Sequence, residues 1–291
     1  MERTGGHAKG GWGVGGVLAV GWACLDLRFK VTNWPPSASR TPAVEYREAP
    51  GGPAAVAAMA VARLGGNVLL VSRRGEDRVG GWLEASLQEA GVLTVFALGK
   101  VTGVSAVLVA PDGERYIFPY RGELPEELDT DMLRWPDWVS VVLADTRWPN
   151  AAEAVFQQAR ERGIPRILDL DGVDEAGLRL GRMASHVIAS EEAAEQADGL
   201  TQLQDLFKEA FVAVTLGPKG VVWPGGKVEA LRVIPHDTTG AGDVFHGAFA
   251  FALSLGMGEG EALAAANVVA GIYVACGEVP TWQEALKWMQ L

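Results

Sequence analysis

The spacing of apolar residues changes along this chain, and the changes outline a series of strands and helices. Residues 17–20 are a short apolar run that ends at a glycine, which is typical of a buried strand. An alanine-rich stretch with helical spacing follows over 53–64, and another short apolar run lies at 68–71. Such alternation predicts a mainly parallel sheet with helices on both faces. We therefore expect an α/β fold.

Short apolar runs typical of strands and stretches with helical spacing alternate as far as the C-terminus. The last fifty residues have mostly helical spacing, with a break at 256–260. Further helices are expected at 79–90, 151–162 and 244–255, and further strands at 139–144, 167–169, 187–188, 211–216 and 228–234.

Two segments depart from this alternation. Residues 28–50 contain prolines at 35, 36, 42 and 50, which exclude a long helix. Residues 103–121 hold two strand-like runs on either side of the turn sequence Pro111–Glu114. We expect these inserts to form one small sheet beside the main body. Residues 1–14 are glycine-rich and predict a flexible N-terminal extension, so that 15–291 form one domain.

Composition and charge narrow the classes of partner. The formal net charge is −11, and Lys and Arg are scattered singly, which argues against nucleic acid as a partner. No apolar run reaches the ~18 residues of a membrane span, so no membrane partner is expected. Cys24 and Cys276, the only cysteines, give no disulfide framework and no metal spacing. We expect a protein of the reducing cytoplasm.

One glycine-rich string carries the chemistry. Residues 237–243 read Asp-Thr-Thr-Gly-Ala-Gly-Asp, directly before the apolar helix expected at 244–255. Gly240, Ala241 and Gly242 bring unpaired N–H groups and the positive end of the helix dipole to one place, which suits the oxygens of a transferring phosphoryl group. Asp243 can accept a proton from an attacking hydroxyl. A plain helix cap would explain only one or two of the seven residues.

This string resembles the second signature of the PfkB, or ribokinase-like, carbohydrate kinases. Gly51-Gly52-Pro53-Ala54-Ala55 resembles the first signature of that family, whose glycine pair approaches the sugar. Asp26 stands where the family keeps a carboxylate for sugar hydroxyls. The resemblance places nucleotide binding at Thr215, Gly217, Gly220, Asn267 and Gly277.

The resemblance implies a three-layer α/β/α domain whose two inserts form a lid over the sugar. It also implies ATP and Mg²⁺ as cofactors, with a monovalent cation left open, and a homodimer formed through the lid. The activity implied is transfer of the γ-phosphoryl group of ATP to a sugar hydroxyl, with Asp243 as the base. Exposed strand edges in the inserts agree with pairing between subunits.

Three positions depart from the family pattern. Val56 stands where most members have Asn, so one polar contact to the sugar is missing or moved. The segment that orders Mg²⁺ in the family should lie near residues 190–193, where Ser190 and Ala193 replace its Asn and Glu. Glu191 and Glu192 are weak candidates for holding the metal, and a solvated helix start explains them equally well.

Within the family, the strings Val141–Asp145 and Asp243–Gly247 most resemble the kinases that act on 6-deoxy-6-sulfofructose. The sulfonate-binding positions of those kinases fall on Arg147, near Arg40, and near Pro119, which cannot donate a hydrogen bond; Arg121 is a candidate replacement. A surface ion pair is the alternative for the first two residues. Ribokinase, fructokinase and nucleoside kinase activities stay open, as does a kinase-like scaffold without turnover.

Overall fold

The computed structural model describes residues 16–35, 40–111 and 114–289. The extension expected at 1–14 and the tip of the turn expected at 111–114 therefore lie outside the described residues.

The main body is built on a nine-stranded sheet, in the order β13-β12-β11-β10-β9-β8-β1-β4-β5. All neighbouring pairs from β11 to β5 are parallel, and β12 and β13 add an antiparallel edge. The strands are β1 (Gly16–Val20), β4 (Asn67–Gly75), β5 (Leu93–Gly99), β8 (Val139–Ala144), β9 (Arg166–Leu170), β10 (His186–Ala189), β11 (Phe211–Thr215), β12 (Val221–Trp223) and β13 (Gly226–Val228).

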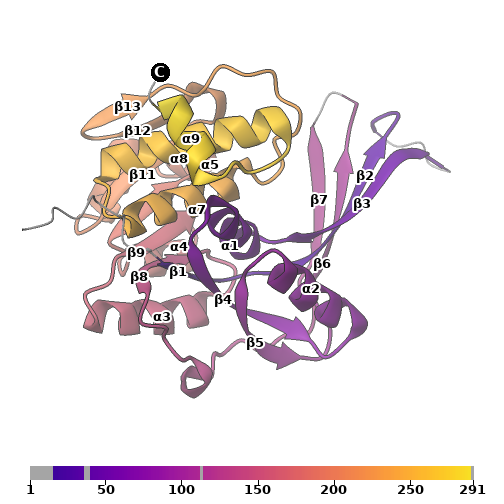
Figure 1. Ribbon diagram of the computed structural model, residues 1–291, viewed down its shortest axis with the longest axis horizontal. Helices are drawn as coiled ribbons and strands as arrows, with labels where there is room; N and C mark the ends of the chain where they lie inside the picture. The colour runs from indigo at the N-terminus through magenta and orange to yellow at the C-terminus, as the bar shows by residue number, and fades with distance from the viewer. Residues whose placement is uncertain (1–15, 36–39, 112–113, 290–291) are drawn as a thin grey trace, which may run out of the picture.

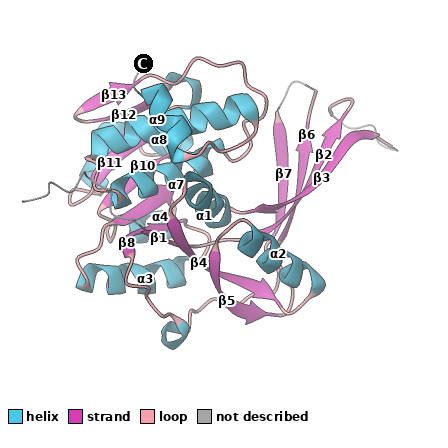
Figure 2. Ribbon diagram, viewed as in Figure 1, coloured by secondary structure: helices cyan, strands magenta, loops and turns pink. Residues whose placement is uncertain are grey.

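Helices cover both faces of this sheet, as Figures 1 and 2 show. One face packs against α1 (Pro53–Leu64), α2 (Arg78–Glu89), α7 (Ala241–Ser254), α8 (Glu259–Cys276) and α9 (Trp282–Met289). The other packs against α3 (Pro149–Glu161), α4 (Glu175–Gly181), α5 (Glu191–Gln196) and α6 (Leu200–Leu206). Strand β1 shows why the strands are continuously apolar: Val17 and Ala19 point into one core, Leu18 and Val20 into the other. The predicted three-layer α/β/α arrangement is confirmed.

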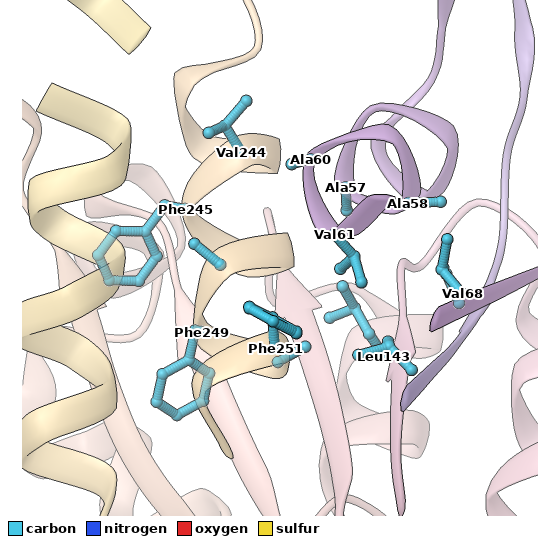
Figure 3. Close-up of a cluster of buried hydrophobic side chains, with 14 of the residues drawn as sticks. Ala57, Ala58, Ala60, Val61, Val68, Leu143, Val244, Phe245, Phe249 and Phe251 are labelled. Atoms are coloured by element: carbon cyan, nitrogen blue, oxygen red, sulfur yellow. The ribbon is translucent and has the colours of Figure 1, made fainter. Parts of the chain in front are cut away.

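Close packing of α1 against α7 fixes the position of the helix that follows the glycine-rich string. Alanines line the inner face of α1, and Figure 3 shows Ala57 and Ala60 directed toward α7. A Cβ on Gly247 would lie 2.4 Å from the carbonyl oxygen of Ala57, so only glycine allows this approach. Phe245 and Phe249 fill the space on the other side of α7. The helix is thus held on both sides before any ligand binds.

A second, smaller sheet extends from the main body (Figure 1), in the order β3-β2-β6-β7. Its strands are β2 (Cys24–Val31), β3 (Ala43–Gly51), β6 (Val104–Val109) and β7 (Arg115–Tyr120). The hairpin of β6 and β7 pairs antiparallel, and β2 joins it as a parallel neighbour of β6. Both predicted inserts contribute strands, so the expectation of one small sheet is confirmed.

At the two edges of the main sheet the strands differ from the sequence predictions. Strand β5 was not expected, because only Phe96 and Ala97 within it are buried. The strand expected at 228–234 is wrong: β13 ends at Val228, and the following residues have no regular structure. Ile234 in that segment is 90% exposed. An apolar sequence does not form a strand where no neighbour can pair with it.

Helix α8 is long and apolar enough to cross a bilayer, judged by length and composition alone. In the fold it packs against α7 and α9 and contributes Leu263 and Val269 to the core.

Candidate active site

The N-terminus of α7 forms the centre of the site. Gly240 caps the helix with φ of +78°, a left-handed conformation that favours glycine. The side chain of Asp237 accepts a hydrogen bond from Thr239 N at 2.8 Å, and the Tyr273 hydroxyl donates to Thr239 O at 2.6 Å. Ala241 N already donates to Thr238 O at 3.2 Å. The turn is therefore held from two sides, and Gly242 and Asp243 carry the N–H groups left for a ligand.

Space for a ligand opens directly at Gly242. A Cβ built on this residue would meet no protein atom within 4 Å. The residue also lines a pocket of about 970 Å³, bounded by the end of β11, the segment 230–235 and one face of α8. A phosphate chain entering this pocket would meet the positive end of the α7 dipole. Residue size at 242 therefore controls access to the helix N-terminus.

Most residues predicted for nucleotide binding line this pocket. Thr215, Gly217, Gly220 and Asn267 all face it. Asn267 is buried and donates to Glu229 O at 2.7 Å, which ties α8 to the pocket wall. Gly277 does not face the pocket; it ends α8 with φ of +76°. Sequence reasoning missed Arg115 of β7, which brings a cation of the small sheet to this pocket.

Asp243 lies in a strongly acidic surrounding. Burial raises its pKa well above the usual range, and the nearby carboxylate of Asp169 raises it further. Asp169, at the end of β9, is itself buried, and its pKa is raised chiefly by that burial. Nε2 of His246 lies 3.4 Å from Asp169 Oδ1, without hydrogen-bond geometry, and burial lowers the pKa of this histidine. A carboxylate with a raised pKa is a better proton acceptor than an ordinary aspartate.

The residues predicted for sugar binding meet at the base of the small sheet. Asp26 is buried on β2, where it accepts from Arg28 Nη2 at 3.3 Å and from Cys24 Sγ at 3.4 Å. A Cβ on Gly51 would lie 2.1 Å from Asp26 Oδ1, and one on Gly52 would lie 2.4 Å from Trp22 O. The glycine pair thus allows β3 and α1 to approach this carboxylate closely. Burial raises the pKa of Asp26, and the charge of Arg28 opposes that rise.

Arg147 and Arg40 differ in their placement. Arg147 Nη2 lies 2.6 Å from Asp171 Oδ2, so the ion pair weighed as an alternative is present. Its positive charge also lowers the pKa of Arg121, an effect second only to burial. Arg121 lies 4.1 Å over the ring of Trp22, at the junction of the two sheets. Arg40 is exposed just before β3. Arg121 and Arg147 therefore lie near each other, and the role expected of Arg40 stays a prediction.

The weak metal candidates lie away from the pocket. Glu191 pairs with Lys219 Nζ at 2.7 Å, and Glu192 accepts from Gln196 Nε2 at 3.4 Å. Ser190 caps α5 by accepting from Ala193 N at 3.1 Å, so this segment is a helix start. Within the described ranges no group of three or more His, Cys, Asp or Glu side chains is placed to hold a metal ion.

Comparison with known proteins identifies the family. Residues 15–283 match the model of the pfkB family carbohydrate kinases. A ribokinase of Bacillus subtilis is 29% identical over 285 residues, covering 92% of this chain and 97% of that protein. The chain belongs to the PfkB family of carbohydrate kinases.

Other relatives of this PfkB kinase agree with that membership. Fructokinase-1 of Oryza sativa is 30% identical over 264 residues, covering 79% of this chain and 81% of that protein. The structure of a candidate ribokinase from Agrobacterium tumefaciens superposes with a TM-score of 0.87 at 31% identity, covering 96% of this chain and 98% of the other. Arabidopsis thaliana ribokinase, solved with ribose and ATP, gives a TM-score of 0.77 at 25% identity, covering 95% and 99%.

The open space at Gly242 generates a direct prediction. Gly242→Val should fold with near wild-type stability, because its side chain meets no protein atom, yet phosphoryl transfer should be lost because the side chain fills the ligand space. Gly81→Val is the matched control, since Gly81 is exposed on α2 and is equally free of contacts. Thermal unfolding and ADP release measure the two properties. Wild-type turnover in folded Gly242→Val would contradict this role.

Proposed function

We propose that this PfkB kinase transfers the γ-phosphoryl group of ATP to a ketose that carries an anionic group at C6, with 6-deoxy-6-sulfofructose as the favoured substrate and its C1 hydroxyl as the acceptor. The observation that carries the anionic preference is the pair Arg121 and Arg147. The Arg121 guanidinium stacks over Trp22, that of Arg147 pairs with Asp171, and the charge of Arg147 lowers the pKa of Arg121 in addition to the effect of burial. Two cations at one place favour an anionic ligand.

Packing around Arg147 supports this interpretation. Arg147 N donates to the buried carboxylate of Asp145 at 2.7 Å, and Arg73 Nη2 donates to Arg147 O at 3.0 Å. The backbone of Arg147 is therefore fixed, and only its side chain is free to exchange Asp171 for a ligand. An arginine can meet two sulfonate oxygens with parallel N–H donors, as it does with a carboxylate.

The residues of the site supply a consistent mechanism. Asp26 accepts hydrogen bonds from sugar hydroxyls, and Asp243 accepts the proton of the attacking hydroxyl. The N–H groups at Gly242 and Asp243 stabilise the charge on the phosphoryl oxygens. Thr215, Gly217, Gly220 and Asn267 bound the pocket for ATP. Mg²⁺, when bound with ATP, would neutralise part of the phosphate charge.

A substrate panel tests the proposed function. We expect kcat/KM to be higher for 6-deoxy-6-sulfofructose or fructose 6-phosphate than for fructose or ribose, with ADP release as the readout. Arg147→Ala removes a charge-assisted contact of about 1.5–3 kcal/mol, so KM for the anionic substrate should rise roughly 10–100-fold while fructose is barely affected. Arg179→Ala, which breaks an exposed ion pair with Glu153, is the matched control.

Equal effects of Arg147→Ala on anionic and neutral sugars would remove the anionic preference, and so would a higher kcat/KM for ribose or fructose. The relatives named as ribokinase and fructokinase make those two sugars the informative competitors. Absence of ADP release with every sugar and nucleoside would instead favour a scaffold without turnover.

The proposed assembly is a dimer formed through the small sheet. Large apolar side chains are exposed on its outer strands, with Tyr46 53% exposed on β3 and Phe118 57% exposed on β7. Such a patch beside open strand edges favours pairing with a second copy. Light scattering at micromolar concentration should therefore give twice the monomer mass.

Replacing one of these side chains tests the surface itself. Phe118→Lys should shift the protein toward monomer, whereas Leu98→Lys, at an equally exposed position on β5, should leave the dimer intact. A monomeric wild type, or equal dissociation in both variants, would contradict assembly through this sheet.

A further inference from the structure

Arg28 connects the sugar site to the turn at the start of α7. It lies on β2 two residues after Asp26, so both side chains leave the same face of the small sheet. Nη2 lies 3.3 Å from Asp26 Oδ2, and Nη1 lies 3.9 Å from Asp237 Oδ2. The Arg28 side chain is only 17% exposed. One guanidinium thus bridges a carboxylate of the small sheet and a carboxylate of the main body.

The second carboxylate belongs to the turn that shapes the phosphoryl site. Asp237 holds Thr239 N, and Tyr273 holds Thr239 O, directly before the capping residue Gly240. The charge of Arg28 affects both Asp237 and Tyr273. Burial tends to raise the pKa of Asp237, but hydrogen bonds from Thr239 lower it and the charge of Arg28 lowers it further. The charge and hydrogen bond of Arg28 also oppose the rise in the pKa of Tyr273 that burial causes. A shift of Arg28 would therefore disturb the turn on both sides.

One N–H donor of Arg28 is not used within the described part of the protein. Its Nε is buried and has no hydrogen-bond partner among the described residues. A buried N–H without a partner is unfavourable, which makes it a contact site for a ligand oxygen. A Cβ on Gly240 would lie 3.3 Å from Val56 Cγ1 and 3.7 Å from the Tyr273 hydroxyl, so the missing polar side chain belongs to a position that adjoins the same turn.

We propose that Arg28 positions the acceptor sugar for phosphoryl transfer, by offering its Nε–H to a sugar oxygen and by holding the Asp26 carboxylate and the 237–239 turn at a fixed separation. The inference rests on the proposed function, since it needs Asp26 to bind the sugar and Asp243 to accept its proton. Arg28 thereby couples sugar binding to the geometry of the phosphoryl site. Affinity for ATP alone does not depend on it.

Steady-state kinetics of Arg28→Met and Arg28→Lys test this role. Loss of one charge-assisted contact should lower kcat/KM for the sugar roughly 10–100-fold in Arg28→Met, with the KM for ATP unchanged. Lysine keeps the charge and should restore part of the loss. Arg47→Met is the matched control, because Arg47 faces Arg28 across the β2–β3 ladder and is exposed.

The bridge to Asp237 is tested by a double-mutant cycle. Asp237→Asn alone should also lower kcat/KM for the sugar, and the double variant Arg28→Met/Asp237→Asn should lose less than the product of the two single losses.

Additive losses, or Arg28→Met kinetics equal to those of Arg47→Met, would overturn the inference while leaving the kinase intact. If Arg28→Met does not fold, the cycle is measured with Arg28→Lys and Asp237→Asn, and the same comparison of kcat/KM values applies. A wild type that phosphorylates no sugar overturns the proposed function itself, and the inference with it.

Discussion

The buried carboxylate of Asp145 is the constraint on which the site depends. It follows β8 and accepts hydrogen bonds from Trp22 N at 2.8 Å, Ala54 N at 3.1 Å and Arg147 N at 2.7 Å. These donors begin three different segments: the passage from β1 into the small sheet, helix α1 with its preceding glycine pair, and the turn that carries Arg147. A Cβ on Gly21 would lie 2.3 Å from the same carboxylate, so the backbone closes around it. Burial raises the pKa of Asp145 although the backbone donors oppose that rise, so its ionised form depends on all three donors remaining in place.

From this junction the site is assembled in two halves. The small sheet leaves the main body at Trp22 and brings Asp26 and Arg28 to the sugar side, whereas α1 packs through Ala57 on Gly247 and fixes α7 on the phosphoryl side. The two halves meet where Arg28 faces Asp237. Rigid packing explains how α7 stays in place with an open N-terminus and a crowded group of carboxylates. The acidic surroundings of Asp243 are unfavourable for folding and favourable for proton acceptance, which is a common compromise at catalytic groups.

Local patterns predicted the fold well. The apolar runs at 17–20, 68–71 and 141–144 lie in β1, β4 and β8, where both faces of the sheet are buried, and the Gly240–Asp243 string carries its own backbone chemistry. The missed residues act through contacts that no local pattern contains. Asp145, Asp169 and Tyr273 are ordinary residues in sequence. They matter only because the fold brings them to distant segments, from Tyr273 and Thr239 at a separation of 34 residues to Asp145 and Trp22 at a separation of 123. Arg121 lies near Arg147 for the same reason, since its stacking on Trp22 is set by the junction of the sheets.

The central claim is that Asp243 is held as a strained proton acceptor, and Asp243→Asn tests it most directly. Because the pKa of Asp243 is raised in the folded state, the ionised carboxylate lowers the free energy of unfolding at neutral pH. This destabilisation decreases as pH falls and is absent below the usual pKa of aspartate, about 3.9. The asparagine variant should therefore lose ~10²–10⁴-fold in kcat and yet have a higher Tm than wild type at pH 7, with the difference in Tm shrinking on acidification. Near-normal turnover in the folded variant, or a Tm below that of wild type at pH 7, would contradict the account.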